Sequence, residues 1–378
     1  MRVDLVDPPA YSPPYDHALA TALGRLGASV RLVTSEFAYG DAPAPEGYAR
    51  EERFYRHARG PAGSRLRALT KRAEHPLDML AYRRAAGRGA DVVHFQWLTV
   101  PSLDLRLLPP RPTVLTIHDP LRRGGPPLPG SAFTRLAAIV VHSEYAREQV
   151  IAQHGLEPGR VHVIRHGVLR TREAFPTTTA GNASFVGGGP RNGLPIELQD
   201  TGEPVVLSYG LLRPYKGIET LLTAWRGITG AQLWVVGRPM MDPAPIRSAA
   251  GNGVQFVSRF VTPAEEAALF ERADIVVLPY ERSERFGFSG VLATALGHGK
   301  AIVLSDVGGL SEVGALGAAR LVAPGEPAAL HDALAQLLAD GEARARLAVA
   351  AAQAAATEYS WETAARATLA LYETIAAP

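Results

Sequence analysis

The sequence predicts an α/β protein built from two doubly wound, parallel-sheet domains. Three observations lead to this prediction. Short apolar runs bounded by Gly, Pro or Asp alternate with longer segments of helical periodicity, as in parallel sheets covered by helices. The alternation stops over residues 169–203 and then starts again. The chain has 378 residues, which at roughly 150 residues per domain corresponds to two or three domains.

The first domain is predicted to occupy residues 1–168. Helical patterns precede its second strand, at His17–Gly24, and its last strand, at Glu144–Gln153. The predicted strands are Val3–Val6, Ser29–Val33, Val92–Phe95, Thr113–Ile117, Ala138–Val141 and Val161–Ile164. Residues 169–203 contain runs of Thr and Gly and show no sustained helical or strand periodicity. A loop of this length is unusual inside one compact domain, so these residues are predicted to form a linker.

The second domain is predicted to occupy residues 204–360. Its predicted strands are Val205–Tyr209, Gln232–Val236, Val254–Val257, Ile275–Leu278, Ala301–Leu304 and Arg320–Val322, and its helices are Gly217–Gly227, Pro263–Arg272, Gly290–Gly297 and Ala328–Leu338. Two such domains facing each other leave a cleft, and ligands bind at the carboxyl ends of the strands. Residues 361–378 form a last helix after the predicted N-cap Ser360; it packs on the second domain or crosses back to the first.

The composition excludes several classes of protein. Cysteine is absent, which rules out disulfides, cysteine zinc sites and a thiol nucleophile. The formal net charge of +2 is too small to favour nucleic-acid binding. The first residues already alternate like a strand and lack a signal-peptide core, and no apolar stretch approaches the ~18 residues of a membrane span. A cytoplasmic protein is therefore expected.

Basic residues gather between Arg53 and Arg88. Ten Lys or Arg residues lie there, opposed only by Glu74 and Asp78, and Leu66 and Leu69 stand one turn apart among them. This pattern has two interpretations. One is a solvated helix face, and the other is peripheral contact with an anionic membrane at its inner face, or with a phosphorylated acceptor.

Two segments of the second domain indicate an anion site. Arg213 and Lys216 follow a predicted strand and precede a helix, where free backbone N–H groups and the helix dipole favour negative charge. Ser289 is a predicted N-cap of the helix that begins at Gly290. A further glycine-containing turn, 305–313, ends the next strand. Three such loops on one sheet edge suggest a nucleotide diphosphate site.

The ordered set of motifs resembles family 4 retaining glycosyltransferases of the GT-B fold. The similarity spans nearly the whole chain, and its motifs are Thr116-Ile117-His118-Asp119, Val141-His142-Ser143-Glu144, Ile164-Arg165-His166-Gly167, Arg213…Lys216-Gly217, Ala273-Asp274…Pro279-Tyr280, Ser289-Gly290-Val291 and Gly308-Gly309…Glu312-Val313. Arg165 stands where the family has proline.

The resemblance implies roles for particular residues. Arg213 and Lys216 would neutralise the donor diphosphate, Glu284 would hold sugar hydroxyls, and His118 would lie near the transferred sugar. The other implied donor-binding residues are Gly210, Arg259, Phe260, Val261, Phe288, Ser289, Gly290, Val291, Thr294 and Glu312, and the implied acceptor-side residues are Tyr11, Tyr15, Asp16 and His166.

Two features depart from the family pattern. The second of two glutamates, which binds the ribose in relatives, is absent: counting from Glu284 reaches Leu292, and counting back from Gly299 reaches Thr294. This resembles a subgroup with Ser-Gly-Val in that stretch. The loop 7–16 also replaces the usual paired glycines.

Plainer structural interpretations stand beside these roles. His118 could satisfy buried backbone groups, His166 could shape a turn, Asp16 could cap a helix, and His94 is typical of a core histidine. The sequence shows no metal-ligand spacing and no Asp-x-Asp pair.

The resemblance implies a metal-independent, retaining glycosyltransferase. It would use a nucleotide-diphosphate sugar as co-substrate, no further cofactor, and a glycan, lipid-linked or small-molecule acceptor. A sugar-nucleotide epimerase, a phosphorylase or a non-catalytic sugar-nucleotide binding protein are the alternatives.

Overall fold

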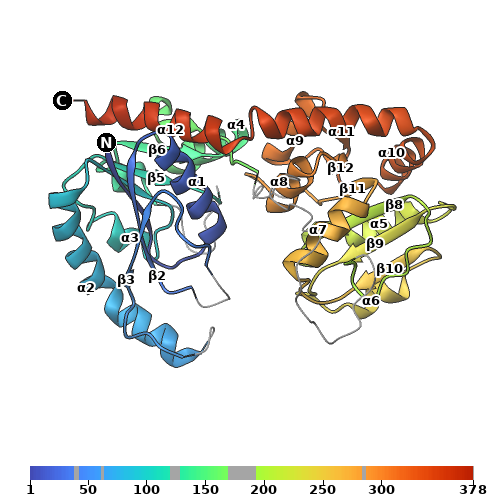
Figure 1. The fold of residues 1–378 in the computed structure, drawn as a ribbon, viewed down its shortest axis with the longest axis horizontal. Helices are drawn as coiled ribbons and strands as arrows, with labels where there is room; N and C mark the ends of the chain where they lie inside the picture. Colours follow the sequence, from blue (N-terminus) through green and yellow to red (C-terminus); the bar gives the residue numbers. More distant parts are fainter. Residues whose placement is uncertain (38–41, 61–63, 120–127, 169–192, 283–286, 378) are drawn as a thin grey trace, which may run out of the picture. The chain divides into compact units, whose positions relative to one another are not determined.

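The computed structural model describes residues 1–37, 42–60, 64–119, 128–168, 193–282 and 287–377, and the chain divides into two compact units. The first unit comprises Met1–Gly167 and Ser360–Pro378, and the second comprises Val168–Tyr359 (Figure 1). Each contains one sheet whose paired strands all run parallel. The predicted architecture of two doubly wound α/β domains is confirmed.

The first unit contains a seven-stranded sheet in the order β3-β2-β1-β4-β5-β6-β7. Its strands are β1 (Arg2–Asp7), β2 (Ser29–Ser35), β3 (Ala49–Phe54), β4 (Val92–Phe95), β5 (Thr113–Thr116), β6 (Ala138–Val141) and β7 (Val161–Val163), and its helices are α1 (Pro13–Arg25), α2 (Arg65–Gly89), α3 (Pro101–Asp104), α4 (Glu144–His154) and α12 (Trp361–Ala376). The strand order reverses between β1 and β4, which places the loops after these two strands next to each other.

No bounds were predicted from the sequence for three of these elements: β3, α2 and the short helix α3. Strand β3 is an edge strand with mostly charged residues, so it shows no apolar run. Helix α2 carries Pro76 in its interior and apolar residues on more than one side, which obscures the helical period. Helix α2 lies almost entirely in the basic segment Arg53–Arg88, which was interpreted as a helix face but without helix bounds.

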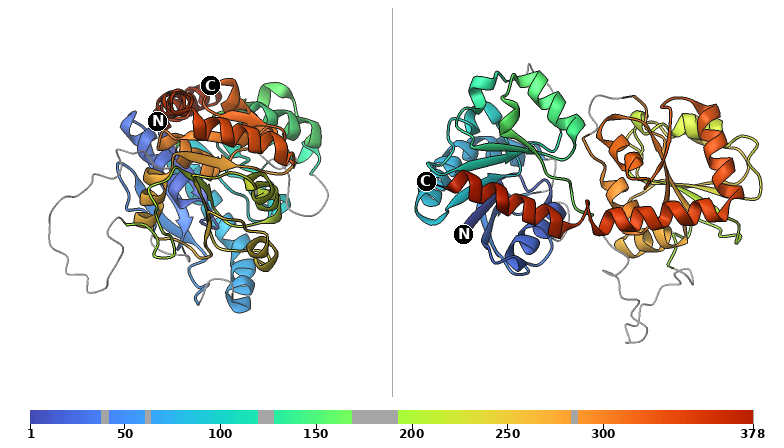
Figure 2. Two further views of the ribbon diagram at one scale, coloured as in Figure 1. Left: turned by 90° about the vertical axis from the view of Figure 1, so that its right-hand side faces the viewer. Right: turned by 90° about the horizontal axis from the view of Figure 1, so that it is seen from above.

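Helix α12 packs against α1 and belongs to the first unit (Figure 2). Its buried residues Ala365, Leu371 and Tyr372 share one core with Leu19 and Leu23 of α1. The Tyr372 hydroxyl also bonds His94 Nδ1 at 2.6 Å, and His94 Nε2 bonds the Thr116 hydroxyl at 2.7 Å. His94 therefore lies in the core, where it ties α12 to β4 and β5.

The second unit contains a six-stranded sheet in the order β10-β9-β8-β11-β12-β13. Its strands are β8 (Val205–Tyr209), β9 (Gln232–Val236), β10 (Val254–Val257), β11 (Ile275–Leu278), β12 (Ala301–Ser305) and β13 (Arg320–Val322), and its helices are α5 (Ile218–Trp225), α6 (Ala244–Ser248), α7 (Pro263–Arg272), α8 (Gly290–Gly297), α9 (Ser311–Ala315), α10 (Pro327–Ala339) and α11 (Gly341–Ala356). The strand order reverses between β8 and β11.

The segment assigned by sequence to a linker is only partly described, because residues 169–192 lie outside the described ranges. Residues 193–203 are part of the second unit: Leu194 and Leu198 are buried in its core with Val205. Residues 193–203 form neither a helix nor a strand, so a search for helical or strand periodicity does not find this packing. Val168 also joins the second unit, where its N–H donates to the Tyr359 carbonyl at 2.8 Å.

Candidate functional site

A lysine, a tyrosine and a serine meet at the carboxyl edge of the second sheet. Lys216 ends a short 3₁₀ turn after β8, Tyr280 follows β11, and Ser289 precedes α8. The Lys216 ammonium donates to the Tyr280 hydroxyl and lies 3.9 Å from the centre of that ring. The hydroxyls of Tyr280 and Ser289 are 3.1 Å apart. Strands β8 and β11 are the neighbours between which the strand order reverses, the usual ligand position in such sheets.

The environment of Lys216 is partly enclosed by aromatic rings. Lys216 is half-buried, with the Tyr215 and Tyr280 rings beside its ammonium. Burial, with a smaller contribution from the charge of Arg213, lowers the pKa of Lys216 to about 7. A bound anion would favour the charged form of this lysine. The arrangement is therefore suited to binding a phosphate group.

Gly217 lets this loop lie directly against the chain that leaves β11. Its φ is +65°, and a Cβ there would lie 1.8 Å from the Pro279 carbonyl oxygen. No side chain can occupy that space without moving the backbone. The Glu281 N–H donates to the Tyr215 carbonyl at 2.9 Å and fastens the two segments together.

A hollow of about 180 Å³ lies at the carboxyl ends of β8, β9 and β10. It is lined by Tyr209, Gly210, Leu211, Gly237, Arg238, Arg259, Phe260 and Val261, which include four predicted donor-binding residues. The Arg259 guanidinium is held by Glu197 and Glu265, so it braces the turn. The exposed Phe260 ring lies 5.3 Å from the Arg238 guanidinium. An aromatic face beside a cation in a small hollow is suited to stacking a flat heterocycle.

Helix α8 begins at Gly290, as predicted, but its predicted cap serves another purpose. The Ser289 hydroxyl does not cap the helix and contacts Tyr280 instead. Val291 faces Gly210: a Cβ added at Gly210 would lie 3.0 Å from Val291 Cγ2. Thr294 is buried, and its hydroxyl donates to the Gly290 carbonyl at 3.1 Å. Its hydrogen-bonding capacity is thus partly used within the helix.

The remaining predicted donor-side residues are placed as follows. Phe288 stacks on Tyr359 with ring centres 5.4 Å apart. Glu312 lies in the first turn of α9. Glu284 lies outside the described residues.

A cavity of about 640 Å³ opens at the carboxyl edge of the first sheet. It is lined by Tyr11, Gln96, Trp97, Leu98, Thr99, Pro101, Leu115, Thr116, Ile117, His118, Asp119, Leu128, Phe133 and His154. Gln96 is fully buried, and the described residues offer no hydrogen-bond partner to its amide oxygen or its amide nitrogen. A buried polar group without a partner costs free energy, which a hydroxylated ligand could recover. The Trp97 indole N–H donates to the Ser12 hydroxyl at 2.8 Å, which fixes the ring at the cavity wall.

Three histidines and Tyr15 pack together beside this cavity. The His142 Nε2 and His118 Nδ1 atoms are 3.0 Å apart, and the Tyr15 ring lies 4.8 Å from His118 and 4.9 Å from His166. His166 Nδ1 bonds the Gly167 carbonyl at 2.6 Å. The structure therefore brings three predicted residues together: His118, Tyr15 and His166. Burial is the main cause that lowers the pKa of His118, of His142 (to about 4) and of His166 (to about 3), so these rings are neutral near pH 7.

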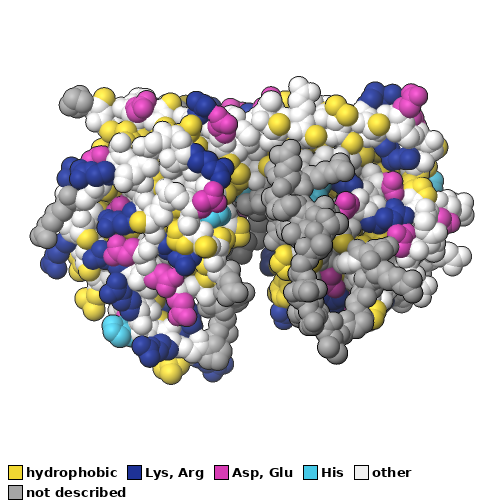
Figure 3. Space-filling view, viewed as in Figure 1, with side chains coloured by type: hydrophobic (Ala, Val, Ile, Leu, Met, Phe, Trp, Pro, Cys, Tyr) yellow, Lys and Arg dark blue, Asp and Glu magenta, His cyan; other side chains and the backbone are white. Residues whose placement is uncertain are grey.

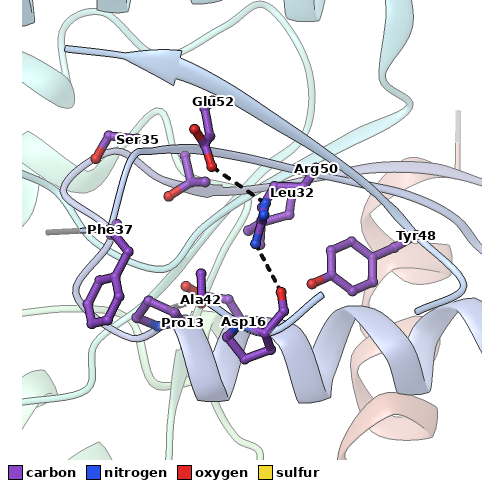
Figure 4. A pocket seen from close by; sticks show the side chains of 12 residues that line it. Pro13, Asp16, Leu32, Ser35, Phe37, Ala42, Tyr48, Arg50 and Glu52 are labelled. Atoms are coloured by element: carbon purple, nitrogen blue, oxygen red, sulfur yellow. Dashed lines mark hydrogen bonds and ion pairs between the residues drawn. The ribbon is translucent and has the colours of Figure 1, made fainter. Parts of the chain in front are cut away.

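The other predicted acceptor-side residues differ in exposure. Tyr11 is 64% exposed and meets Trp97 edge-on, with ring centres 5.5 Å apart. Asp16 is buried in the first turn of α1, where it lines a small pocket with Tyr48 and Arg50 (Figure 4). Arg50 is engaged by Glu52 and by the Pro43 carbonyl.

Asp16 forms a buried carboxyl pair with Asp7. Burial, reinforced by the Asp7 charge, raises the pKa of Asp16 well above its ordinary value, and burial also raises the pKa of Asp7. Both shifts disfavour a negative charge on the two carboxyl groups at the same time. Asp7 accepts the Ser12 N–H at 3.1 Å, and Ala10 adopts a φ of +54° in the same loop. The Asp7 carboxylate thus holds together the loop 7–16, which stands where the family has paired glycines.

Replacement of Asp16 by asparagine should remove a pH dependence of stability. The folded-state pKa of Asp16 is raised, so its contribution to stability is complete below the unfolded value of about 4 and is lost as pH rises towards the folded value. Relative to the Asp16→Asn variant, the wild type should lose up to about 1.4 kcal/mol per pH unit above pH 4. Urea unfolding at several pH values measures this, and parallel pH slopes for the two proteins would contradict it.

Several residues of these sites were missed as functional candidates. Gln96, Trp97, Arg238 and Tyr280 each follow a predicted strand within two residues, and His142 follows another directly. The rule that ligands bind at strand carboxyl ends was a signal that could have found them. What the sequence does not show is which of these residues lie on adjacent strands.

Within the described ranges, no group of three or more His, Asp or Glu side chains could hold a metal ion. Of the helices that the structure describes, none is both long enough and apolar enough to cross a membrane.

Comparison with known families matches both units. Residues 15–172 match the model described as Glycosyltransferase Family 4, and residues 203–340 match the model described as Glycosyl transferases group 1. The chain belongs to these glycosyltransferases. The resemblance inferred from the ordered motifs is thereby confirmed.

Individual proteins are similar to parts or all of the chain. Phosphatidyl-myo-inositol mannosyltransferase of Mycobacterium leprae is 37% identical over 173 residues, which is 43% of this chain and 44% of that protein. The chain spans about half the length of the curated relatives it matches. Two solved structures share the fold over 99% of both chains: sucrose-phosphate synthase of Thermosynechococcus elongatus (TM-score 0.70, 19% identity) and Anabaena Alr3699/HepE in complex with UDP-glucose (TM-score 0.66, 17% identity).

Proposed function

We propose that this glycosyltransferase moves a sugar from a nucleotide-diphosphate sugar to a hydroxyl group, with retention of configuration. The observation that supports this most strongly is the cluster of Lys216, Tyr280 and Ser289, with Arg213 close to Lys216, at the strand-order reversal of the second sheet. A diphosphate carries the charge that these cations would neutralise. The hollow lined by Phe260 and Arg238 would take the base.

The reaction would depend on stabilising the leaving diphosphate. As the glycosidic bond breaks, negative charge develops on the phosphate oxygen, where Arg213 can donate two parallel hydrogen bonds and Lys216 acts as a point charge. Backbone N–H groups of Ser289, Gly290 and Val291 would bind the distal phosphate or the sugar. The acceptor hydroxyl would attack from the face that the diphosphate leaves, and the leaving phosphate would take its proton.

The acceptor is proposed to bind in the cavity of the first unit. The buried Gln96 amide, which no described residue pairs with, offers one donor group and one acceptor group to adjacent hydroxyls, and Trp97 offers an apolar ring face. A hydroxylated ring such as a sugar or cyclitol matches that chemistry. The Mycobacterium leprae relative is named for a lipid that contains myo-inositol, which agrees with an acceptor of this class.

A panel of nucleotide sugars tests the proposed function. UDP-glucose is the first probe, because it is bound by the similar Anabaena protein, and GDP-mannose and UDP-N-acetylglucosamine complete the set. The true donor should raise the melting temperature, since a ligand at 100 times its Kd adds about 2.7 kcal/mol. Nucleotide release should then require an acceptor hydroxyl, and the product should keep the donor's anomeric configuration. Conversion of the donor without acceptor would favour an epimerase, and binding without turnover would favour a binding protein.

Sugar transfer should not require a divalent metal. The proposed clamp places two cations where a metal ion would otherwise offset the diphosphate charge. Initial rates measured with and without EDTA should therefore agree within about twofold. Removing one strong electrostatic donor would instead lower the rate by about 10²-fold. Loss of activity in EDTA that manganese restores would contradict the metal-independent mechanism.

We also propose that α2 contacts an anionic membrane surface. At about 3.6 residues per turn, Leu66, Leu69, Ala73, Leu77 and Leu80 fall on one side of α2, and all are exposed. The buried residues His75, Met79 and Tyr82 fall on the opposite side. The five exposed residues form a second apolar stripe on α2, which has no partner among the described residues of this unit. Basic residues lie beside this stripe (Figure 3).

The bases beside this stripe are not all equally available. Arg65, Arg72 and Arg84 are exposed, whereas the buried Arg67 donates to the Gly60 carbonyl and Lys71 lies over the Tyr55 ring. An exposed apolar stripe flanked by exposed bases is typical of a helix that lies in the interface of an anionic bilayer. This arrangement favours the membrane over the solvated-face interpretation.

Vesicle cosedimentation tests the contact. Binding to phosphatidylglycerol vesicles should exceed binding to phosphatidylcholine vesicles and should fall as salt rises. The double variant Arg65→Glu/Arg72→Glu should bind at least roughly tenfold more weakly, since each base is worth about 1 kcal/mol near the surface. The matched variant Arg226→Glu/Arg346→Glu, on the second unit, should bind like the wild type. Equal loss in both variants, or no pelleting at all, would leave the solvated face as the better interpretation.

A further inference from the structure

A chain of hydrogen bonds in the first unit begins at the Ile164 carbonyl and ends at His118. His142 Nδ1 lies 2.9 Å from the Ile164 oxygen, and His142 Nε2 lies 3.0 Å from His118 Nδ1. A carbonyl oxygen accepts hydrogen bonds and cannot donate them. The Nδ1 atom of His142 must therefore carry a proton.

The protonation of His142 then determines that of His118. Burial lowers the pKa of His142 to about 4, so near pH 7 this ring is neutral and holds a single proton. That proton is on Nδ1, which leaves Nε2 as an acceptor. The only polar partner that the described residues place there is His118 Nδ1, which must donate. His118 therefore carries its own proton on Nδ1.

The other nitrogen of His118 is left with an unshared electron pair. The pKa of His118 is lowered well below its ordinary value by burial and by the neighbouring rings of His142, His166 and His94, so a second proton is absent near pH 7. Its Nε2 atom is buried and has no hydrogen-bond partner in the part of the chain that the structure describes, although the residue lines the first-unit cavity. Such an atom can accept a hydrogen bond and cannot donate one.

We propose that His142 is a positioning residue that fixes His118 as the Nδ1–H tautomer, so that His118 Nε2 accepts a hydrogen bond from a hydroxyl of the substrate in the first-unit cavity. The nature of that substrate rests on the proposed function; the tautomer does not. In this form His118 favours a hydroxyl over a carbonyl, a phosphate oxygen or a deoxy position, because none of these can donate to Nε2.

Packing holds the His118 ring in place but does not choose its tautomer. Trp97 stacks on the ring at 4.8 Å with an interplanar angle of 15°, and Tyr15 meets it edge-on at 4.8 Å. Ring contacts of this kind are the same for both neutral tautomers. The hydrogen bond from His118 to His142 is the described interaction that distinguishes them.

Nitrogen-15 NMR of the full chain with labelled histidine tests the tautomer directly and without any ligand. Loss of signals in His118→Gln assigns the His118 resonances. In the wild type at pH 7, Nδ1 should resonate as a protonated nitrogen and Nε2 as an unprotonated one. His142→Gln, whose amide oxygen can still accept, should keep this pattern, and His142→Leu should lose it. His94→Leu is the matched control, because it also removes a buried, hydrogen-bonded histidine but does not touch the Nδ1 atom of His118.

A protonated Nε2 in the wild type, or an unchanged tautomer in a folded His142→Leu protein, would overturn the proposal. If His142→Leu fails to fold, the spectra of the wild type and of His142→Gln still show which nitrogen of His118 carries the proton. Kinetics add a second readout with UDP-glucose or GDP-mannose, whichever is turned over. The kcat/KM of His142→Leu should fall on the order of tenfold, the size of one neutral hydrogen bond, and His142→Gln should recover most of it. If neither donor is turned over, the proposed function is in question while the tautomer result stands.

Discussion

Replacing Arg213 or Lys216 with alanine should lower the kcat of sugar transfer by about 10²–10³, the usual effect of removing one strong electrostatic donor at a transition state. The two cations lie near each other, and Lys216 is held by Tyr280 at the point where the strand order reverses. Their contribution grows as charge develops on the leaving diphosphate, so kcat should change more than KM. Steady-state kinetics with the donor identified by the panel measure both constants.

Two controls sharpen this prediction. Arg226→Ala removes an exposed cation at the end of α5, outside the cluster, and should leave kcat within about twofold, well inside the loss expected from a clamp residue. The wild-type kcat/KM for donor should also fall as pH rises through the lowered pKa of Lys216, about 7, because only the charged form attracts the diphosphate. Lys216→Arg keeps its charge at all these pH values, so its kcat/KM should not fall over this pH range. Full activity of Arg213→Ala and Lys216→Ala would show that the cations play no part in transfer.

The variant Gly217→Ala should destabilise the second unit by about 3 kcal/mol or more. Two costs add: a left-handed backbone costs a non-glycine residue about 1–2 kcal/mol, and the new Cβ would overlap a backbone oxygen. That oxygen belongs to Pro279, and the Cβ would lie 1.8 Å from it. Because Gly217 directly follows Lys216, donor binding should also weaken beyond what the loss of stability explains. Urea unfolding and a donor titration measure the two effects.

Gly227→Ala is the matched control for Gly217→Ala. Gly227 also has a left-handed backbone, with a φ of +87°, but a Cβ there would meet nothing within 4 Å. It should therefore show only the conformational cost, about 1–2 kcal/mol. If both variants lose the same stability, the close approach of the β8 and β11 loops is not what requires glycine at position 217.

Sequence reasoning was most successful where the residues carry a local signal. The strands of both sheets are short apolar runs, and nearly all were predicted within a residue or two. Strand β3 was missed because Ala49–Phe54 is a charged edge strand. The anion cluster was half predicted: Lys216 stands out as a cation before a helix, whereas Tyr280, 64 residues later, was noted only as part of a motif and given no role.

The site in the first unit shows more clearly the same contrast between residues that carry a local sequence signal and residues that do not. His118, Tyr15 and His166 were named as site residues, whereas His142 was noted only within a motif and Gln96 and Trp97 were given no role. Asp16 was interpreted as an acceptor-side residue or a helix cap. Its buried pairing with Asp7 depends on the turn that brings the end of β1 against the start of α1.

By itself the sequence determined the two α/β domains, the absence of cysteine chemistry, the family and the cations of the proposed clamp. These follow from apolar periodicity and from ordered short motifs, both of which are properties of neighbouring residues. Only the tertiary structure decided which side chains share a site. Strand order places β8 beside β11 and β1 beside β4, and that order arises from crossover connections between segments far apart in the chain. The proton on His118, the raised pKa values of Asp7 and Asp16 and the lowered pKa of Lys216 depend on burial and on partners that only such juxtaposition supplies.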